Sequence, residues 1–246
     1  MSWVREFFDE IYLETYKSFL TEERNKREAE LIAKLLDLKR GEKVLDVACG
    51  HGRHSILLAK MGYVVTGVDI TPLFIEKAKR NAQSAGVDVE FIVSDARELN
   101  FVKEFDAAFM VFTSFGYYGL EDDFKILKSI SKALKDNGRF LLDIWNPYRT
   151  FQKYAEASRN WWVANNILVI EETSYDYLTG FVNSLRKFFK KGVEIGERKF
   201  SVKVYMPWEI KNMMLKAGFQ DVAFMGGLDG SKFEIGSRRM VILAKK

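Results

Sequence analysis

The sequence predicts an α/β fold in which a mostly parallel sheet of seven strands carries helices on both faces. Three observations predict it. Short apolar runs alternate with helix-like segments between residues 44 and 144, and the first three runs contain or lead into the acids Asp46, Asp69 and Asp95. The length of 246 residues, 48% of them hydrophobic, suffices for one large core. We therefore expect a single domain over residues 1–246.

The first apolar run, 44–47, passes straight into a tight turn of small residues. Ala48, Gly50 and Gly52 allow the backbone to turn and to approach a ligand without a side-chain clash. A helix follows near Ile56, and its first N–H groups are free to face whatever lies in the turn. This segment is therefore the first candidate ligand site.

Four further strands follow, in the order expected of a parallel sheet. Phe124, Leu127 and Ile130 recur at helical spacing between the last two of them. A helix over 207–218 then precedes a closing, hairpin-like pair of strands. The four strands are expected at 62–69, 89–95, 106–111 and 140–144, and the closing pair at 221–225 and 240–244.

Two helices are predicted before the sheet. Aromatic residues recur near helical spacing from Trp3 to Tyr16, and a second apolar stripe runs from Leu31 to Leu38. We expect residues 1–40 to form a helical lid over the ligand site. The alternative is that these stripes only pack against the rest of the fold.

A β-rich insertion over 147–206 follows the fifth strand. Three runs rich in β-branched and aromatic residues, 166–175, 180–190 and 197–205, predict an antiparallel meander. The insertion leaves from the carboxyl ends of the parallel strands, where open α/β sheets hold ligands. We therefore expect a cap over a second-substrate site, with an oligomer interface as the alternative.

The spacing of the glycines separates two classes of nucleotide ligand. A dinucleotide-binding turn requires G-x-G-x-x-G or a closing Ala, and Ser55 occupies that third position. Counting from Asp46 gives D-x-A-x-G-x-G instead, with Ala48 at one of the small positions. Asp69 ends the second strand, where a carboxylate can accept hydrogen bonds from ribose hydroxyls, and Asp95 ends the third.

These features resemble the motifs of class I S-adenosylmethionine-dependent methyltransferases, in a prokaryotic family of the small-molecule type. The resemblance covers nearly the whole chain and is weakest over about 147–206. It implies a Rossmann-like sheet, S-adenosylmethionine as the cofactor and an N-terminal segment that covers the site. The segments that carry it are LDVACGHGRH, GVDIT, SDAREL, FDAAFMVFTSFGYY, GRFLLDIWN and the terminal GLDGSKFEIGSRRMVILAKK.

The resemblance also implies which residues contact the ligands. Asp69 would accept hydrogen bonds from the ribose, and Asp95 with a neighbouring N–H would hold the adenine. The expected cofactor contacts are Tyr16, Asp46, Ala48, Cys49, Gly50, Gly52, Arg53, His54, Asp69, Ile70, Ser94, Asp95, Ala96, Arg97 and Phe112. Ser114, Tyr117, Trp145 and Asn146 are expected beside the methyl acceptor, with Tyr16 and Phe112 at its border. An aromatic cage for a cation is one option there.

Composition and charge exclude several other functions. The net charge of +4 is spread among 34 acidic residues, and the one dense basic cluster, which begins at Arg186 and ends at Lys191, is typical of a solvated strand face. A nucleic-acid partner is therefore not expected. The single cysteine, Cys49, rules out an internal disulfide and a Cys-rich zinc site. His51 and His54 lack a nearby third ligand, so no metal is expected.

The sequence thus predicts a methyltransferase that moves a methyl group to an N or O atom of a small molecule. No catalytic residue is assigned, because the sulfonium is already activated and a general base is optional. The longest apolar runs are strand-length and no secretory signal opens the chain, so a cytoplasmic monomer or dimer without a membrane partner is expected. The alternatives are an RNA or protein methyltransferase and a non-catalytic cofactor-binding protein. Ser55 and Asp95 disfavour a nicotinamide oxidoreductase.

Overall fold

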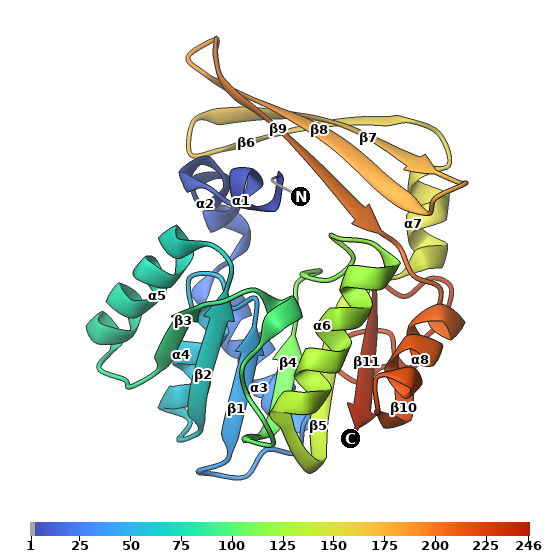
Figure 1. The fold of residues 1–246 in the computed structure, drawn as a ribbon. Coiled ribbons are helices and arrows are strands. Elements are labelled where there is room, and N and C mark those ends of the chain that lie inside the picture. Colours follow the sequence, from blue (N-terminus) through green and yellow to red (C-terminus); the bar gives the residue numbers. More distant parts are fainter. Residues whose placement is uncertain (1–2) are drawn as a thin grey trace.

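The computed structural model describes residues 3–246 and contains two sheets (Figure 1). The larger sheet has seven strands in the order β10-β11-β5-β4-β1-β2-β3. Its strands are β1 (Lys43–Val47), β2 (Val64–Asp69), β3 (Glu90–Val93), β4 (Phe105–Met110), β5 (Leu134–Trp145), β10 (Gln220–Met225) and β11 (Arg239–Lys245). Strands β1 to β5 pair in parallel, whereas β11 is antiparallel to β5 and to β10. The predicted sheet is confirmed.

Helices cover both faces of this sheet, as predicted. On strand β1, Leu45 and Val47 point into a core shared with helices α6 and α8, whereas Val44 belongs to a core on the other face, shared with α3 and α4. All three side chains are fully buried. The alternation of one strand between two cores explains why the run is continuously apolar. The helices are α3 (Glu22–Leu35), α4 (Arg53–Lys60), α5 (Pro72–Ala85), α6 (Leu120–Ala133) and α8 (Pro207–Lys216).

The N-terminal segment differs from its prediction, of which residues 3–40 are described. Instead of one helix up to Tyr16, the chain forms α1 (Trp3–Phe7), α2 (Glu10–Tyr16) and a short 3-10 turn. The break has a local cause, because the Asp9 carboxylate accepts a hydrogen bond from the Tyr12 N–H at 2.9 Å and starts a new helix. The aromatic spacing alone could not reveal this cap.

The insertion after β5 also differs in detail. It begins with α7 (Pro147–Tyr154) and continues into a four-stranded antiparallel sheet, where three strands and no helix were expected. The missed strand is β6, an edge strand whose Trp161 is 73% exposed, so its burial pattern is weak. The sheet consists of β6 (Ser158–Ala164), β7 (Ile167–Asp176), β8 (Phe181–Lys190) and β9 (Val193–Lys203).

The small sheet lies over the carboxyl ends of the parallel strands, with α1 and α2 beneath it (Figure 1). Phe7 of α1 packs against Phe200 and Val202 of β9. The Asp9 carboxylate pairs with Arg198 of the same strand. The N-terminal helices and the insertion therefore form one layer above the sheet edge. No helix in residues 3–246 is long and apolar enough to cross a membrane.

Candidate functional site

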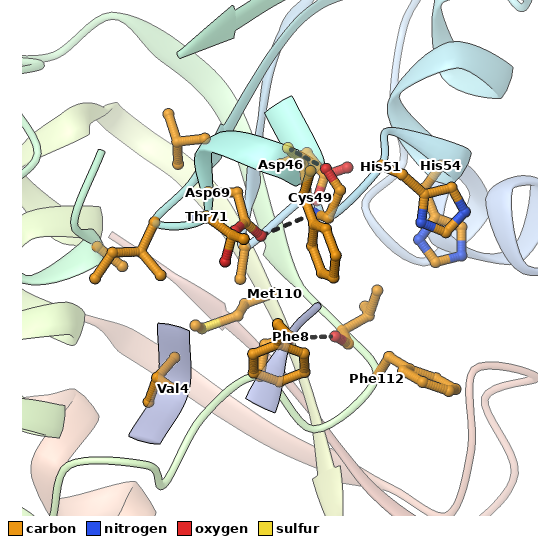
Figure 2. Close-up of a pocket in the computed structure, with 18 of the residues that line it drawn as sticks. Val4, Phe8, Asp46, Cys49, His51, His54, Asp69, Thr71, Met110 and Phe112 are labelled. Carbon is orange, nitrogen blue, oxygen red and sulfur yellow. Dashed lines mark hydrogen bonds between the residues drawn. The ribbon is translucent and has the colours of Figure 1, made fainter. Parts of the chain in front are cut away.

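A cavity of about 930 Å³, partly open to solvent, lies at the carboxyl edge of β1, β2 and β4, and we call it the first chamber (Figure 2). The segment after β1, the end of β2 and the loop after β4 form its floor. Val4, Phe8 and Tyr12 from the N-terminal segment line its other side. Of the residues expected at the cofactor, Asp46, Ala48, Cys49, Gly50, Arg53, His54, Asp69, Ile70, Ser94, Ala96 and Phe112 line this chamber.

The turn after β1 depends on small residues. Ala48, Gly50 and Gly52 all adopt positive φ angles, of 58°, 57° and 80°. At Gly52 a Cβ would come within 2.7 Å of the Phe91 ring, so this glycine also permits close packing of the turn on β3. Gly52 begins α4 and does not itself line the chamber. Its contact with a cofactor therefore stays a prediction.

Two buried carboxylates mark the strand side of the first chamber. Asp46 accepts a hydrogen bond from the Ser55 hydroxyl at 2.5 Å, and burial raises the pKa of Asp46 to about 7. Asp69 accepts the Gly50 N–H on one oxygen and the Thr71 N–H on the other, both at 2.9 Å (Figure 2). Burial raises the pKa of Asp69 as well. Since each carboxylate oxygen has two lone pairs, both oxygens of Asp69 can accept one further hydrogen bond.

Asp95 and Arg97 bond to each other. The Arg97 guanidinium reaches the Asp95 carboxylate at 2.6 Å, pairs with Asp122 at 2.7 Å and lies over the Tyr118 ring. Neither Asp95 nor Arg97 lines the first chamber, although their neighbours Ser94 and Ala96 do. The pair holds the loop that carries these neighbours, and its own contact with a cofactor stays a prediction.

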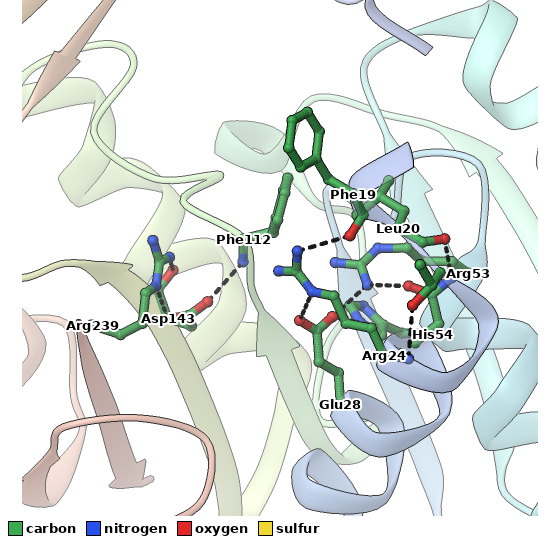
Figure 3. A network of polar contacts seen from close by, with 11 residues as sticks. Phe19, Leu20, Arg24, Glu28, Arg53, His54, Phe112, Asp143 and Arg239 are labelled. Carbon is green, nitrogen blue, oxygen red and sulfur yellow. Dashed lines mark hydrogen bonds and ion pairs between the residues drawn. The ribbon is translucent and has the colours of Figure 1, made fainter. Parts of the chain in front are cut away.

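Glu28 of α3 bonds to both Arg53 and His54, the two residues that follow the glycine turn (Figure 3). It accepts hydrogen bonds from Arg53 and from His54, the latter at 3.0 Å. Burial lowers the pKa of His54 to about 4, so the ring is neutral at pH 7 and donates to Glu28. Within residues 3–246 no cluster of three or more His, Cys, Asp or Glu could hold a metal ion.

A second chamber, of about 600 Å³ and also partly open, adjoins the first. Phe8, Tyr12, Phe112 and Tyr117 line both chambers. The remaining lining of the second chamber is Trp3, Phe7, Tyr16, Thr113, Trp145, Arg186, Phe200, Val202 and Arg239. Two ligands placed in the two chambers would therefore meet at the four shared side chains.

The residues expected beside an acceptor are distributed over both chambers. Tyr117 and Trp145 line the second chamber, and Ser114 lines the first. Tyr16, expected at the cofactor and at the border of the acceptor, lines only the second chamber, where its hydroxyl accepts a hydrogen bond from Arg186 at 2.9 Å. The cofactor contact expected of Tyr16 stays a prediction.

Asn146 requires a correction. Its side-chain oxygen accepts the Tyr148 N–H at 3.1 Å and caps α7, and its NH₂ group donates to backbone carbonyls of the loop before β11. The residue is only 1% exposed and lines neither chamber. Asn146 therefore joins α7 to that loop, and the acceptor contact predicted for it is wrong.

Arg186 is the main residue that the sequence analysis misjudged. It is 8% exposed and lines the second chamber, so the prediction that it belongs to a solvated strand face is wrong. A signal was present, because Val182, Ser184 and Phe188 stand two or four residues away and share its buried face of β8. Phe8, Tyr12 and Arg239 were likewise missed as lining residues.

Comparison with known proteins identifies the class. Residues 44–138 match the family model described as a methyltransferase domain. The crystal structure of an S-adenosylmethionine-dependent methyltransferase from Clostridium acetobutylicum ATCC 824 superposes with a TM-score of 0.82 at 19% identity, covering 98% of each chain. Residues 44–138 therefore form a methyltransferase domain, and the fold of the chain is that of an S-adenosylmethionine-dependent methyltransferase, in agreement with the predicted resemblance.

Curated relatives differ in what they act on. The 27-O-demethylrifamycin SV methyltransferase of Amycolatopsis mediterranei (strain S699) is 32% identical over 130 residues, which is 51% of this chain and 47% of that protein. The tRNA (uracil(54)-C(5))-methyltransferase of Pyrococcus abyssi (strain GE5 / Orsay) is 36% identical over 104 residues, or 42% of this chain and 25% of that protein. This chain spans about half or less of the length of these relatives.

Proposed function

We propose that the protein binds S-adenosylmethionine in the first chamber and transfers its methyl group to an N or O atom of a small molecule in the second. The observation that carries the proposal is that the two chambers are neighbours and share part of their lining. Four side chains, Phe8, Tyr12, Phe112 and Tyr117, belong to both linings. A methyl donor and its acceptor would therefore lie next to each other.

The donor set of the first chamber fits this cofactor. Asp69 keeps a free lone pair on each oxygen and stands at the end of β2, where it would accept hydrogen bonds from the two ribose hydroxyls. Ile70, Phe74 and Met110 offer apolar surface for the adenine. Asp46, on the same wall, would face the amino-acid end, with its positive charge.

The chemistry needs little from the protein beyond alignment and the exclusion of water. The cofactor supplies a methyl group already activated on a sulfonium. Aligning the two ligands removes most of the entropic cost of their encounter. The N-terminal helices and the small sheet would keep water from the shared boundary, in keeping with the lid and cap roles expected of residues 1–40 and 147–206. An N or O acceptor that carries a proton would release it to solvent, so no general base is assigned.

A small acceptor is favoured over a macromolecule by the second chamber. Its lining comes from six separate parts of the chain and includes the aromatic side chains Trp3, Phe7, Tyr16, Trp145 and Phe200. A concave, mostly aromatic lining with a few polar side chains is typical of sites for small molecules. The relative that acts on rifamycin also supports a small acceptor.

Isothermal titration tests the cofactor assignment directly. We expect S-adenosylhomocysteine and S-adenosylmethionine to bind with one site per chain, and NAD to give no heat. Transfer of a tritiated methyl group from S-adenosylmethionine to a mixture of small amines, phenols and carboxylic acids would then test turnover. Binding of NAD without uptake of either methionine-derived ligand would overturn the proposal.

A further inference from the structure

Two guanidinium groups stand in the otherwise aromatic lining of the second chamber. Arg186 comes from β8 and Arg239 from the start of β11. No carboxylate lines this chamber within the described part of the chain. The proposed function leaves both arginines without a role.

Arg186 is held rigidly. Its Nε donates to the Glu171 carboxylate at 2.6 Å, and its Nη1 donates to the Tyr16 hydroxyl at 2.9 Å. Its Nη2 donates to no acceptor within residues 3–246. Four aromatic rings surround the guanidinium carbon at 4.7 to 5.6 Å from their centroids, and they belong to Phe7, Tyr16, Trp162 and Phe200. The group is thus fixed in place and keeps donors for a ligand.

Arg239 repeats this arrangement elsewhere in the lining. Its Nε donates to the Asp143 carboxylate at 2.6 Å and its Nη2 donates to the Thr113 hydroxyl at 2.6 Å (Figure 3). Its Nη1 has no acceptor among the residues described. Asp143 also accepts the Phe112 N–H at 3.0 Å, so this ion pair fixes the loop that divides the chambers.

The counter-ions lie outside the chamber. Glu171 and Asp143 balance the two arginines but neither carboxylate is part of the lining. A ligand in the chamber would therefore meet guanidinium N–H groups and no negative side chain. A protonated amine would find no negatively charged acceptor in the lining, whereas a carboxylate would gain charge-assisted hydrogen bonds.

An aromatic cage for a cationic ligand is not available around Arg186. Such a cage needs ring faces that are open to the ligand. Here the Arg186 guanidinium already lies over the rings of Phe7, Tyr16 and Phe200. Around Arg186 the protein's own cation takes the place that a ligand's cation would need, and the remaining N–H groups of the guanidinium form a polar end of the chamber.

We propose that the acceptor is a small carboxylic acid with an apolar or aromatic body, whose carboxylate is held by Arg186. This inference rests on the proposed function and names its substrate class. Arg239 adds further guanidinium N–H donors to the same lining. With the carboxylate at Arg186, the body of the acceptor extends past Phe7 and Trp145 and brings its N or O atom to the boundary formed by Phe112 and Tyr117.

Three isosteric probes test the charge preference: 3-phenylpropionate, 3-phenylpropionamide and 3-phenylpropylamine. Each is titrated calorimetrically into the full-length protein saturated with S-adenosylhomocysteine. We expect the carboxylate to bind at least tenfold more tightly than the neutral amide, and the amine to bind most weakly. A carboxylate that binds no more tightly than the amide, or does not bind, overturns the inference.

A pair of double variants assigns the preference to Arg186. Arg186→Met with Glu171→Gln removes the guanidinium without leaving a buried unpaired carboxylate, and should abolish the preference for the carboxylate over the amide. The matched control is Arg159→Met with Glu172→Gln, which removes an ion pair of 2.9 Å on the same sheet whose side chains are 82% and 49% exposed. The control should keep the preference.

The outcomes separate this inference from the proposed function. If S-adenosylhomocysteine binds and the carboxylate preference is missing, only the inference fails. If S-adenosylhomocysteine does not bind, the proposed function fails first. A preference that survives in the Arg186 and Glu171 double variant overturns the role of Arg186, and the three-probe comparison on the unaltered protein decides the substrate class even if that variant does not fold.

Discussion

The two chambers are built in opposite ways. The two carboxylates on the strand side of the first chamber, Asp46 and Asp69, come from neighbouring strands, and they accept hydrogen bonds from the Ser55 hydroxyl and from the Gly50 and Thr71 N–H groups. The polar side chains of the second chamber include Arg186 and Arg239, which stand on strands of different sheets. Local sequence therefore builds one chamber, and the tertiary arrangement builds the other.

The difference in charge follows the difference in construction. Carboxylates at the ends of parallel strands favour a cationic ligand, whereas guanidinium groups whose counter-ions lie outside the lining favour an anionic one. A sulfonium donor and a carboxylate acceptor would each meet the opposite charge. Three changes in and around the first chamber test whether the two chambers are as independent as this comparison implies.

The largest effect is expected from Asp69→Ala. Two charge-assisted hydrogen bonds to the ribose, at about 1.5 to 3 kcal/mol each, would be lost, so the affinity for S-adenosylhomocysteine should fall at least tenfold in isothermal titration. The exposed Asp88→Ala serves as the control and should bind as the parent does. At saturating S-adenosylhomocysteine the variant should still prefer 3-phenylpropionate over the amide. Unchanged affinity in a folded Asp69→Ala variant would mean that another group holds the ribose.

An intermediate effect is expected from Gly52→Ala, compared with Gly86→Ala. Both glycines have positive φ, at 80° and 66°, but an added Cβ would meet the Phe91 ring at 2.7 Å only at Gly52 and nothing within 4 Å at Gly86. Overpacking should therefore lower the free energy of unfolding of Gly52→Ala by about 1 to 3 kcal/mol more than that of Gly86→Ala. Urea denaturation measures the free energy of unfolding of both variants. Equal losses would show that the turn tolerates a side chain.

A third effect is the pH dependence of stability due to Asp46, whose pKa burial raises to about 7. The unfolded chain releases this proton near pH 4 and the folded protein near pH 7, so the stabilising contribution is complete below pH 4 and is lost as the pH rises through 7. The Asp46→Asn variant has no ionisable group at this position. The difference in Tm between the parent and the variant should therefore decrease as the pH rises from 4.5 to 8. The decrease should be roughly 2 to 4 °C for each kcal/mol of stabilising free energy that is lost. A constant difference would contradict the raised pKa.

Several features of the molecule were predictable because their signals are local. The strand at Val44 is buried on both faces and reads as a continuous apolar run, and the turn with Gly52 needs backbone angles that glycine accepts most readily. The acids Asp46 and Asp69 follow from the rule that ligands bind at the carboxyl ends of parallel strands. Those observations sufficed for the sheet, the family and most of the first chamber.

The tertiary structure alone decided the second chamber, the route of the insertion and the partners of several polar side chains. A long side chain such as Arg186 can reach solvent or a buried partner from the same strand, and only the positions of Glu171 and Tyr16 select the buried state. Asn146 is equally able to face a ligand or to cap α7, and the loop before β11 supplies the carbonyls that hold it in the capping role. Residues far apart in the sequence provide these partners, so no local pattern encodes the choice.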